Sequence, residues 1–226
     1  MMKMIDTLLD LLFPSKCPFC ERVQDVPGIC PDCMESLPWT DEAHGLRELE
    51  PGLPCAAPLW YENAVREGIR RFKFHNGVGA AGPLGGLIAQ AAAERFSGRF
   101  DTVAWVPVSA KRLRQRGYDQ SRLLAESACG LWGVAPELLV RKIRDNPAQS
   151  SLQSAEERRK NAQGVYAATG AVSGKRVLLI DDVCSTGSTL SSCAAVLREA
   201  GAAEIVCAVA AFPGPEGENG EEKAKE

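Results

Sequence analysis

Apolar residues recur along the chain at two spacings, which predict both helices and strands. Spacings of three and four residues predict helices that face a core. Short runs of β-branched residues predict buried strands. The helical stripes are Val65, Ile69 and Phe72 in the first segment, and Leu84, Leu87, Ile88 and Ala91 in the second.

The order strand, loop, helix occurs twice in the second half of the chain. Residues 102–108 form an apolar run, followed by a basic loop and a helical stripe at Leu124, Ala128 and Leu131. Residues 177–180 form a second run, followed by a polar loop, a helix that ends at Gly201 and a further strand at 205–212. This alternation predicts a mainly parallel sheet flanked by helices, and ligands of such sheets bind beyond the carboxyl ends of the strands.

A change in composition near Trp60 predicts a domain boundary. The first 60 residues are rich in Cys and Pro, whereas residues 61–213 carry the periodic pattern. We therefore expect a small module at 1–60, an α/β domain at 61–213 and a disordered acidic tail at 214–226. Residues 141–166 are polar and predict a loop or hairpin over the site.

Residues 1–14 have helical spacing of apolar positions, interrupted by Asp6 and Asp10. No small-residue cleavage site follows, so the segment is not a secretory signal. We expect a short amphipathic helix that packs on its own domain, with a membrane surface or a partner as the alternatives.

Composition points to a folded protein, with 45% hydrophobic and 24% charged residues. The net charge of −3 equals that of the tail, so the remainder of the chain is about neutral. Basic clusters at 111–116, 141–144 and 158–160 suit anions, although such runs are often only solvated surface. Nine cysteines without an export signal favour a reducing cytoplasm.

Two C-x2-C pairs near the N-terminus predict a metal site. Cys17 and Cys20 form the first pair, and Cys30 and Cys33 form the second. Four thiolates presented in this way suit a closed, tetrahedral and structural Zn²⁺ site. Two disulfides or unrelated thiols are the alternative. Cys55 stands apart from the pairs and has no predicted metal role.

The run VLLIDDVCSTGSTL carries the candidate chemistry of the second domain. A buried strand is expected to deliver Asp181 and Asp182 at its end, where carboxylates can accept hydrogen bonds from ribose hydroxyls. The hydroxyl-bearing residues that follow open a helix, whose free amides suit a phosphate. Gly187 permits close backbone approach. The bland alternative is a strand end followed by an ordinary helix cap.

These residues resemble the phosphoribosyl pyrophosphate loop of type I phosphoribosyltransferases, and the chain from residue 8 to 212 resembles the ComF family. Further matching signatures are FKFHN at 72–76 and RGYDQS at 116–121. The elements Q-x2-L and R-x2-N also match, at Gln149, Leu152, Arg158 and Asn161. The resemblance implies a type I phosphoribosyltransferase fold preceded by a zinc ribbon.

The resemblance also implies roles for individual residues. Asp181 and Asp182 would hold the ribose, and Arg112 and Arg116 would neutralise the pyrophosphate. Mg²⁺ would be bound mainly by the ligand and by water. Asp119 departs from the common pattern, where Asn stands, and brings a negative charge near this site. The predicted 5′-phosphate ligands are Cys184, Ser185, Thr186, Gly187, Ser188 and Thr189.

Three functions are compatible with these residues. The first, implied by the resemblance, is a DNA-uptake factor of natural transformation that binds phosphoribosyl pyrophosphate and contacts single-stranded DNA and a competence helicase. The second is an active phosphoribosyltransferase with an unidentified acceptor. The third is a non-catalytic interaction scaffold, which the intact acid pair and T-G-S-T loop disfavour.

Overall fold

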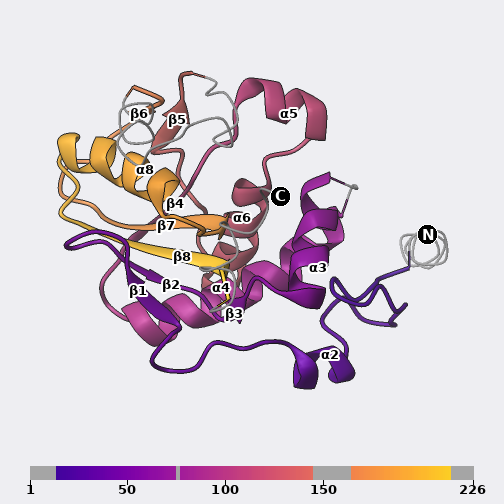
Figure 1. Ribbon diagram of the computed structural model, residues 1–226. Coiled ribbons are helices and arrows are strands. Elements are labelled where there is room, and N and C mark those ends of the chain that lie inside the picture. The colour runs from indigo at the N-terminus through magenta and orange to yellow at the C-terminus, as the bar shows by residue number, and fades with distance from the viewer. Residues whose placement is uncertain (1–13, 75–76, 145–163, 215–226) are drawn as a thin grey trace, which may run out of the picture.

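The computed structural model describes residues 14–74, 77–144 and 164–214 (Figure 1). Several predictions fall outside these ranges: the N-terminal amphipathic helix, the acidic tail, and His75 and Asn76 of FKFHN. The Q-x2-L and R-x2-N elements also lie outside the described residues.

A mostly parallel sheet forms the centre of the described chain (Figure 1). Its order is β1 (Leu46–Glu48), β2 (Pro54–Ala56), β8 (Glu204–Phe212), β7 (Arg176–Val183) and β4 (Thr102–Trp105). Only β1 and β2 are antiparallel, and β3 (Leu59–Trp60) also pairs with β8. The predicted α/β architecture is thereby confirmed.

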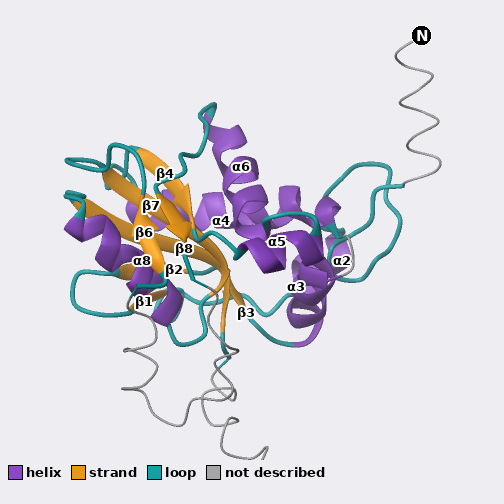
Figure 2. Cartoon of the chain, turned by 90° about the horizontal axis from the view of Figure 1, so that it is seen from above, coloured by secondary structure: helices purple, strands orange, loops and turns teal. Residues whose placement is uncertain are grey.

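Helices cover both faces of this sheet, so the middle parts of β7 and β8 are apolar on both faces. Alternate residues of β7 point to opposite faces. Leu178 and Ile180 pack with α4 (Ala81–Phe96) and α6 (Gln120–Trp132), whereas Val177 and Leu179 pack with α8 (Ser188–Glu199). Figure 2 shows these helices from above.

The predicted helical stripes occupy real helices. Val65, Ile69 and Phe72 are fully buried on α3 (Asn63–Phe74). The stripe of α6 is correct at Leu124 and Ala128, but Leu131 is 67% exposed because it lies near the end of α6, beyond the core contact.

The predicted polar hairpin is present at its two ends. β5 (Val140–Lys142) pairs antiparallel with β6 (Tyr166–Ala168), and the residues between 145 and 163 are outside the described ranges. Short helical segments complete the described chain: α2 (Pro31–Ser36), η1 (Val78–Ala80) and α5 (Ala110–Arg116).

Strands β1 to β3 place residues 46–60 in the main sheet. Cys55 pairs with Cys207 in the β2–β8 register and is fully buried, which gives it a place in the core. The sheet therefore contains residues on both sides of Trp60, the predicted domain boundary. Among the described helices, none has the length and apolar character needed to cross a bilayer.

Helices α4 and α6 approach closely at Gly85. A Cβ at this position would lie 2.5 Å from the Ser127 Cβ and 2.9 Å from the Leu124 carbonyl oxygen. The neighbouring Gly86 has nothing within 4 Å of its Cβ position. The two adjacent glycines therefore differ in packing and not in helical conformation.

We expect Gly85→Ala to destabilise the fold by about 1–3 kcal/mol, because the helices would have to separate. The control Gly86→Ala should be neutral or stabilising by up to about 1 kcal/mol, because alanine favours a helix. Urea unfolding of both variants makes the comparison. Equal stabilities would show that α4 and α6 do not pack as described.

Candidate functional site

The loops that follow β4 and β7 meet at one edge of the sheet. The two strands are parallel, with Trp105 opposite Ile180, and the Val106 amide donates to the Ile180 carbonyl oxygen at 2.9 Å. Beyond this point β7 continues with Asp181 and Asp182, while the chain after β4 leads into α5. The predicted site residues on these two loops therefore lie at the carboxyl edge of the sheet.

The acid pair is held by neighbouring donors. The Asp181 Oδ1 atom accepts from the Ser121 hydroxyl at 2.7 Å and from the Asp182 amide at 2.9 Å. Burial, together with the charge of Asp182, raises the pKa of Asp181 to about 7. Ser121 belongs to the RGYDQS signature, so that motif contacts the acid pair directly.

Lys73 completes this cluster, although it is not among the site residues predicted from the sequence. Its Nζ atom lies 2.8 Å from the Asp182 Oδ1 atom, and the Asp182 side chain is 8% exposed. Burial acts to lower the pKa of Lys73, but the attraction of Asp182 outweighs it, and the pKa is raised. The available signal was the FKFHN signature, whose second residue is Lys73.

The loop at residues 184–189 forms a small pocket with Asp181. The lining includes Asp181 and every residue from Val183 to Leu190. Gly187 has a φ of 73°, a conformation that strains any residue with a side chain, and a Cβ there would also lie close to the Leu49 side chain, at 3.2 Å. The loop residues then lead into the N-terminus of α8, where the first amides have no partners within the helix.

The predicted phosphate ligands are not equivalent in the structure. Ser185 and Thr186 are exposed, and the hydroxyls of Thr186 and Ser188 lie 2.8 Å apart. Cys184 is buried, and its amide donates to the Ala211 carbonyl oxygen at 3.2 Å. Thr189 lines the pocket beside Ser188. The Cys184 side chain thus forms part of the core beneath the loop.

Arg116 is the last residue of α5. Its guanidinium carbon lies 4.7 Å from the Phe74 ring centroid, and its Nη1 atom is buried without a hydrogen-bond partner. Burial and the nearby positive charge of Arg112 lower its pKa, although Asp182 opposes them. A buried guanidinium nitrogen without an acceptor is costly unless an anion binds to it.

Asp119 has a structural role, which explains why a carboxylate stands at this position. One carboxylate oxygen accepts from the Val108 amide and the other from the Arg122 amide, both at 3.1 Å. It therefore caps α6 and ties that helix to the chain after β4. Burial raises its pKa, although these amides oppose the shift.

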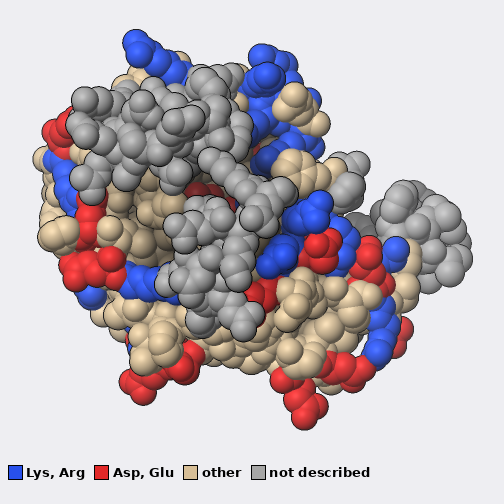
Figure 3. All heavy atoms as spheres, viewed as in Figure 1, with Lys and Arg blue, Asp and Glu red and all other residues tan. Residues whose placement is uncertain are grey.

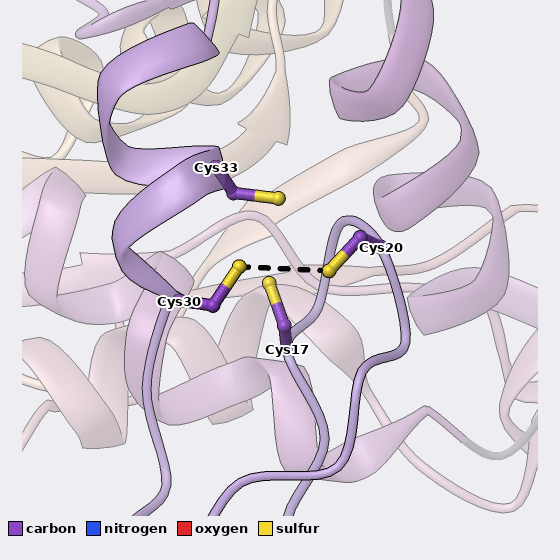
Figure 4. A group of neighbouring side chains, drawn as sticks. All are labelled: Cys17, Cys20, Cys30 and Cys33. Carbon is purple, nitrogen blue, oxygen red and sulfur yellow. Dashed lines mark hydrogen bonds between the residues drawn. The ribbon is translucent and has the colours of Figure 1, made fainter.

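The four cysteines of the two C-x2-C pairs converge in space (Figure 4). Their sulfur atoms all lie within 4.8 Å of one another, with Cys20 and Cys30 at 3.6 Å. Burial opposes ionisation of Cys17, but backbone amides of Cys30, Cys20 and Phe19 lower its pKa to about 6. Four soft donors with one stabilised thiolate fit a structural Zn²⁺ ion.

Known protein families agree with this two-part organisation. A family model described as the phosphoribosyl transferase domain matches residues 128–226, and one described as a double zinc ribbon domain matches residues 8–44. The DNA utilization protein YhgH of Salmonella typhimurium is 28% identical over 84% of this chain and 86% of its own length. The competence protein ComFC of Bacillus subtilis is 26% identical over 84% of this chain and 74% of its own.

Over most of its length the chain is therefore similar to proteins of the ComF type. The two matched regions contain the loop at residues 184–189 and the cluster of four cysteines, respectively. One solved structure, the glutamine phosphoribosylpyrophosphate amidotransferase of B. subtilis, matches with a TM-score of 0.40 and 25% identity. The match covers 61% of this chain and only 30% of the solved chain.

The acid pair gives the stability of this protein a defined pH dependence. The pKa of Asp181 is raised from 3.8 to about 7 in the fold, so between these values the folded state binds more protons than the unfolded state. Stability contributed by this group is therefore lost as the pH rises through that range.

We expect Asp181→Asn to be more stable than the wild type at pH 8, by on the order of 1 kcal/mol. The difference should shrink by pH 5, where Asp181 is protonated in the fold. Urea unfolding at both pH values measures the two differences. A variant that is less stable than the wild type at pH 8 would contradict the assignment of a raised pKa.

Proposed function

We propose that this protein acts as a ComF protein, binding phosphoribosyl pyrophosphate with Mg²⁺ at the carboxyl edge of β7 and taking part in the handling of DNA during uptake. One observation carries the ligand assignment: the buried acid pair is followed at once by the hydroxyl-rich loop that opens α8. This order matches the two ends of a ribose 5-phosphate unit.

Each part of the ligand has a partner of suitable chemistry. The carboxylates of Asp181 and Asp182 accept hydrogen bonds from the ribose hydroxyls. The 5′-phosphate occupies the loop at 185–189, close to the first amides of α8. The pyrophosphate lies towards Arg112 and Arg116, and it provides the acceptor that Arg116 Nη1 lacks.

The proposed position of the pyrophosphate also suggests roles for Mg²⁺ and for the two arginines in transfer chemistry. Mg²⁺ bound by the oxygens of the ligand and by water neutralises part of the pyrophosphate charge. Guanidinium groups beside a pyrophosphate also stabilise the charge that develops when pyrophosphate leaves. The site thus suits binding of phosphoribosyl pyrophosphate. Group transfer would also need an acceptor that reaches the anomeric carbon.

Titration calorimetry tests the ligand. We expect phosphoribosyl pyrophosphate with Mg²⁺ to bind to the wild type, and the double variant Asp181→Asn, Asp182→Asn to lose at least roughly tenfold in affinity, because the ribose loses its charged acceptors. Asp25→Asn, an exposed carboxylate in the zinc ribbon, is the matched control and should bind like the wild type. A zinc-loaded, folded wild type that does not bind would refute the assignment.

A basic surface beside the ligand site supports the DNA assignment. Helix α5 buries none of its residues and carries Lys111, Arg112, Arg114 and Arg116. Figure 3 shows basic side chains gathered over this helix. Phe74, under the Arg116 guanidinium, is 60% exposed. Basic groups with an exposed aromatic ring are typical of surfaces that bind single-stranded nucleic acid.

Binding of single-stranded DNA should depend on α5 and on salt. We expect Lys111→Gln with Arg114→Gln to reduce the slope of log affinity against log salt by about 1.4, because about 0.7 is lost for each phosphate contact. The control is the double variant Arg99→Gln, Arg176→Gln. It removes two charges near the amino-terminal ends of β4 and β7. Equal effects of the two double variants would exclude a DNA surface on α5.

A further inference from the structure

Helix α3 contacts the zinc ribbon through Arg71. The Arg71 Nη2 atom donates to the carbonyl oxygens of Pro18 and Phe19, at 3.0 and 2.7 Å. Its Nη1 atom lies 3.7 Å from the Glu21 Oε2 atom. Pro18 and Phe19 lie in the turn between Cys17 and Cys20, and Glu21 follows it. We call residues 17–21 the zinc knuckle, and the Arg71 side chain thus binds it at three points.

The packing beneath Arg71 is equally close. A Cβ at Gly68 would lie 2.7 Å from the Pro18 carbonyl oxygen and 3.0 Å from the Phe19 ring. Phe19 is buried in the same apolar cluster as Ile69 and Phe72 of α3. The knuckle is therefore seated on the helix by packing as well as by hydrogen bonds.

The last turn of the same helix reaches the ligand site. Lys73, two residues after Arg71, forms the ion pair with Asp182. The Tyr118 hydroxyl donates to the Phe72 carbonyl oxygen, and Arg116 lies over the Phe74 ring. The contacts with the zinc knuckle and the contacts with the ligand site thus fall within one stretch of α3, from Gly68 to Phe74.

Lys73 has a clear electrostatic task at this position. Phosphoribosyl pyrophosphate is a polyanion, and two buried carboxylates would repel it. One ammonium group paired with Asp182 offsets part of that charge without occupying the loop at 185–189. The last turn of a helix frays easily, however, because its carbonyl groups lack partners within the helix. The position of Lys73 therefore needs support from outside the turn.

We propose that the zinc knuckle is a positioning element of the ligand site: by gripping Arg71 it holds the end of α3 so that Lys73 stays paired with Asp182. Arg71 is then a positioning residue, and Lys73 is the residue through which it acts. The inference rests on the proposed function, since it concerns affinity for phosphoribosyl pyrophosphate. It assigns the zinc ribbon a role in ligand binding in addition to its own folding.

Substitution of Arg71 tests the proposal in the full-length, zinc-loaded protein. We expect Arg71→Met to weaken binding of phosphoribosyl pyrophosphate with Mg²⁺ roughly 3- to 30-fold, the usual range for coupling through a packed element. Zinc content should not change. Arg70→Met removes the same charge from the preceding residue, whose partner is Glu67, and should bind like the wild type. Arg71→Lys, which can still donate to the knuckle carbonyls, should restore most of the affinity.

A double-mutant cycle separates positioning from general weakening of the fold. Lys73→Met alone should reduce affinity roughly tenfold or more, because Asp182 is left without its partner. Adding Arg71→Met to Lys73→Met should then cause almost no further loss, whereas independent effects would add. Calorimetric titration of the two single variants and the double variant gives the coupling.

The outcomes separate the inference from the function on which it rests. A wild type that does not bind overturns both. A wild type that binds, with an Arg71→Met affinity equal to that of Arg70→Met, overturns the positioning role alone. Additive losses in the cycle also overturn it. If Arg71→Met loses zinc, Gly68→Ala provides a second way to displace the knuckle from α3, and the same absence of coupling would count against the proposal.

Discussion

The structure depends on the burial of two adjacent carboxylates at the end of the central strand. The apolar run of β7 carries Asp181 and Asp182 to the edge of the sheet, where Asp182 is buried and Asp181 is partly buried. Buried charge is tolerated only when it is paired and hydrogen-bonded. Ser121 and Lys73 meet this requirement from two different helices. The arrangement of α3 and α6 around β7 can be understood as the means of holding this pair.

The parts that the sequence predicted correctly are those encoded by local pattern. A buried strand, a hydroxyl-rich loop and an amphipathic helix are contiguous in VLLIDDVCSTGSTL, so their order alone places the pocket. The two C-x2-C pairs are similarly short, and their sulfur atoms do converge. In both cases the spacing along the chain restricts the geometry before any distant contact is made.

The missed features all depend on contacts between distant parts of the chain. Lys73 meets Asp182 across more than a hundred residues, and nothing in its helical stripe marks it as a site residue. The charge of Asp119 seemed to oppose a polyanion, yet its carboxylate caps α6 and accepts from Val108. Residues 46–60 are poor in periodic pattern because their strands are very short, although they extend the sheet.

Hydrogen–deuterium exchange of the full-length protein, with and without phosphoribosyl pyrophosphate and Mg²⁺, tests the central claim most directly. The account predicts slower exchange at the amides of residues 185–190, which face the pocket, and in the turn of α3 that carries Lys73. Unchanged exchange in both segments at a saturating ligand concentration would contradict it.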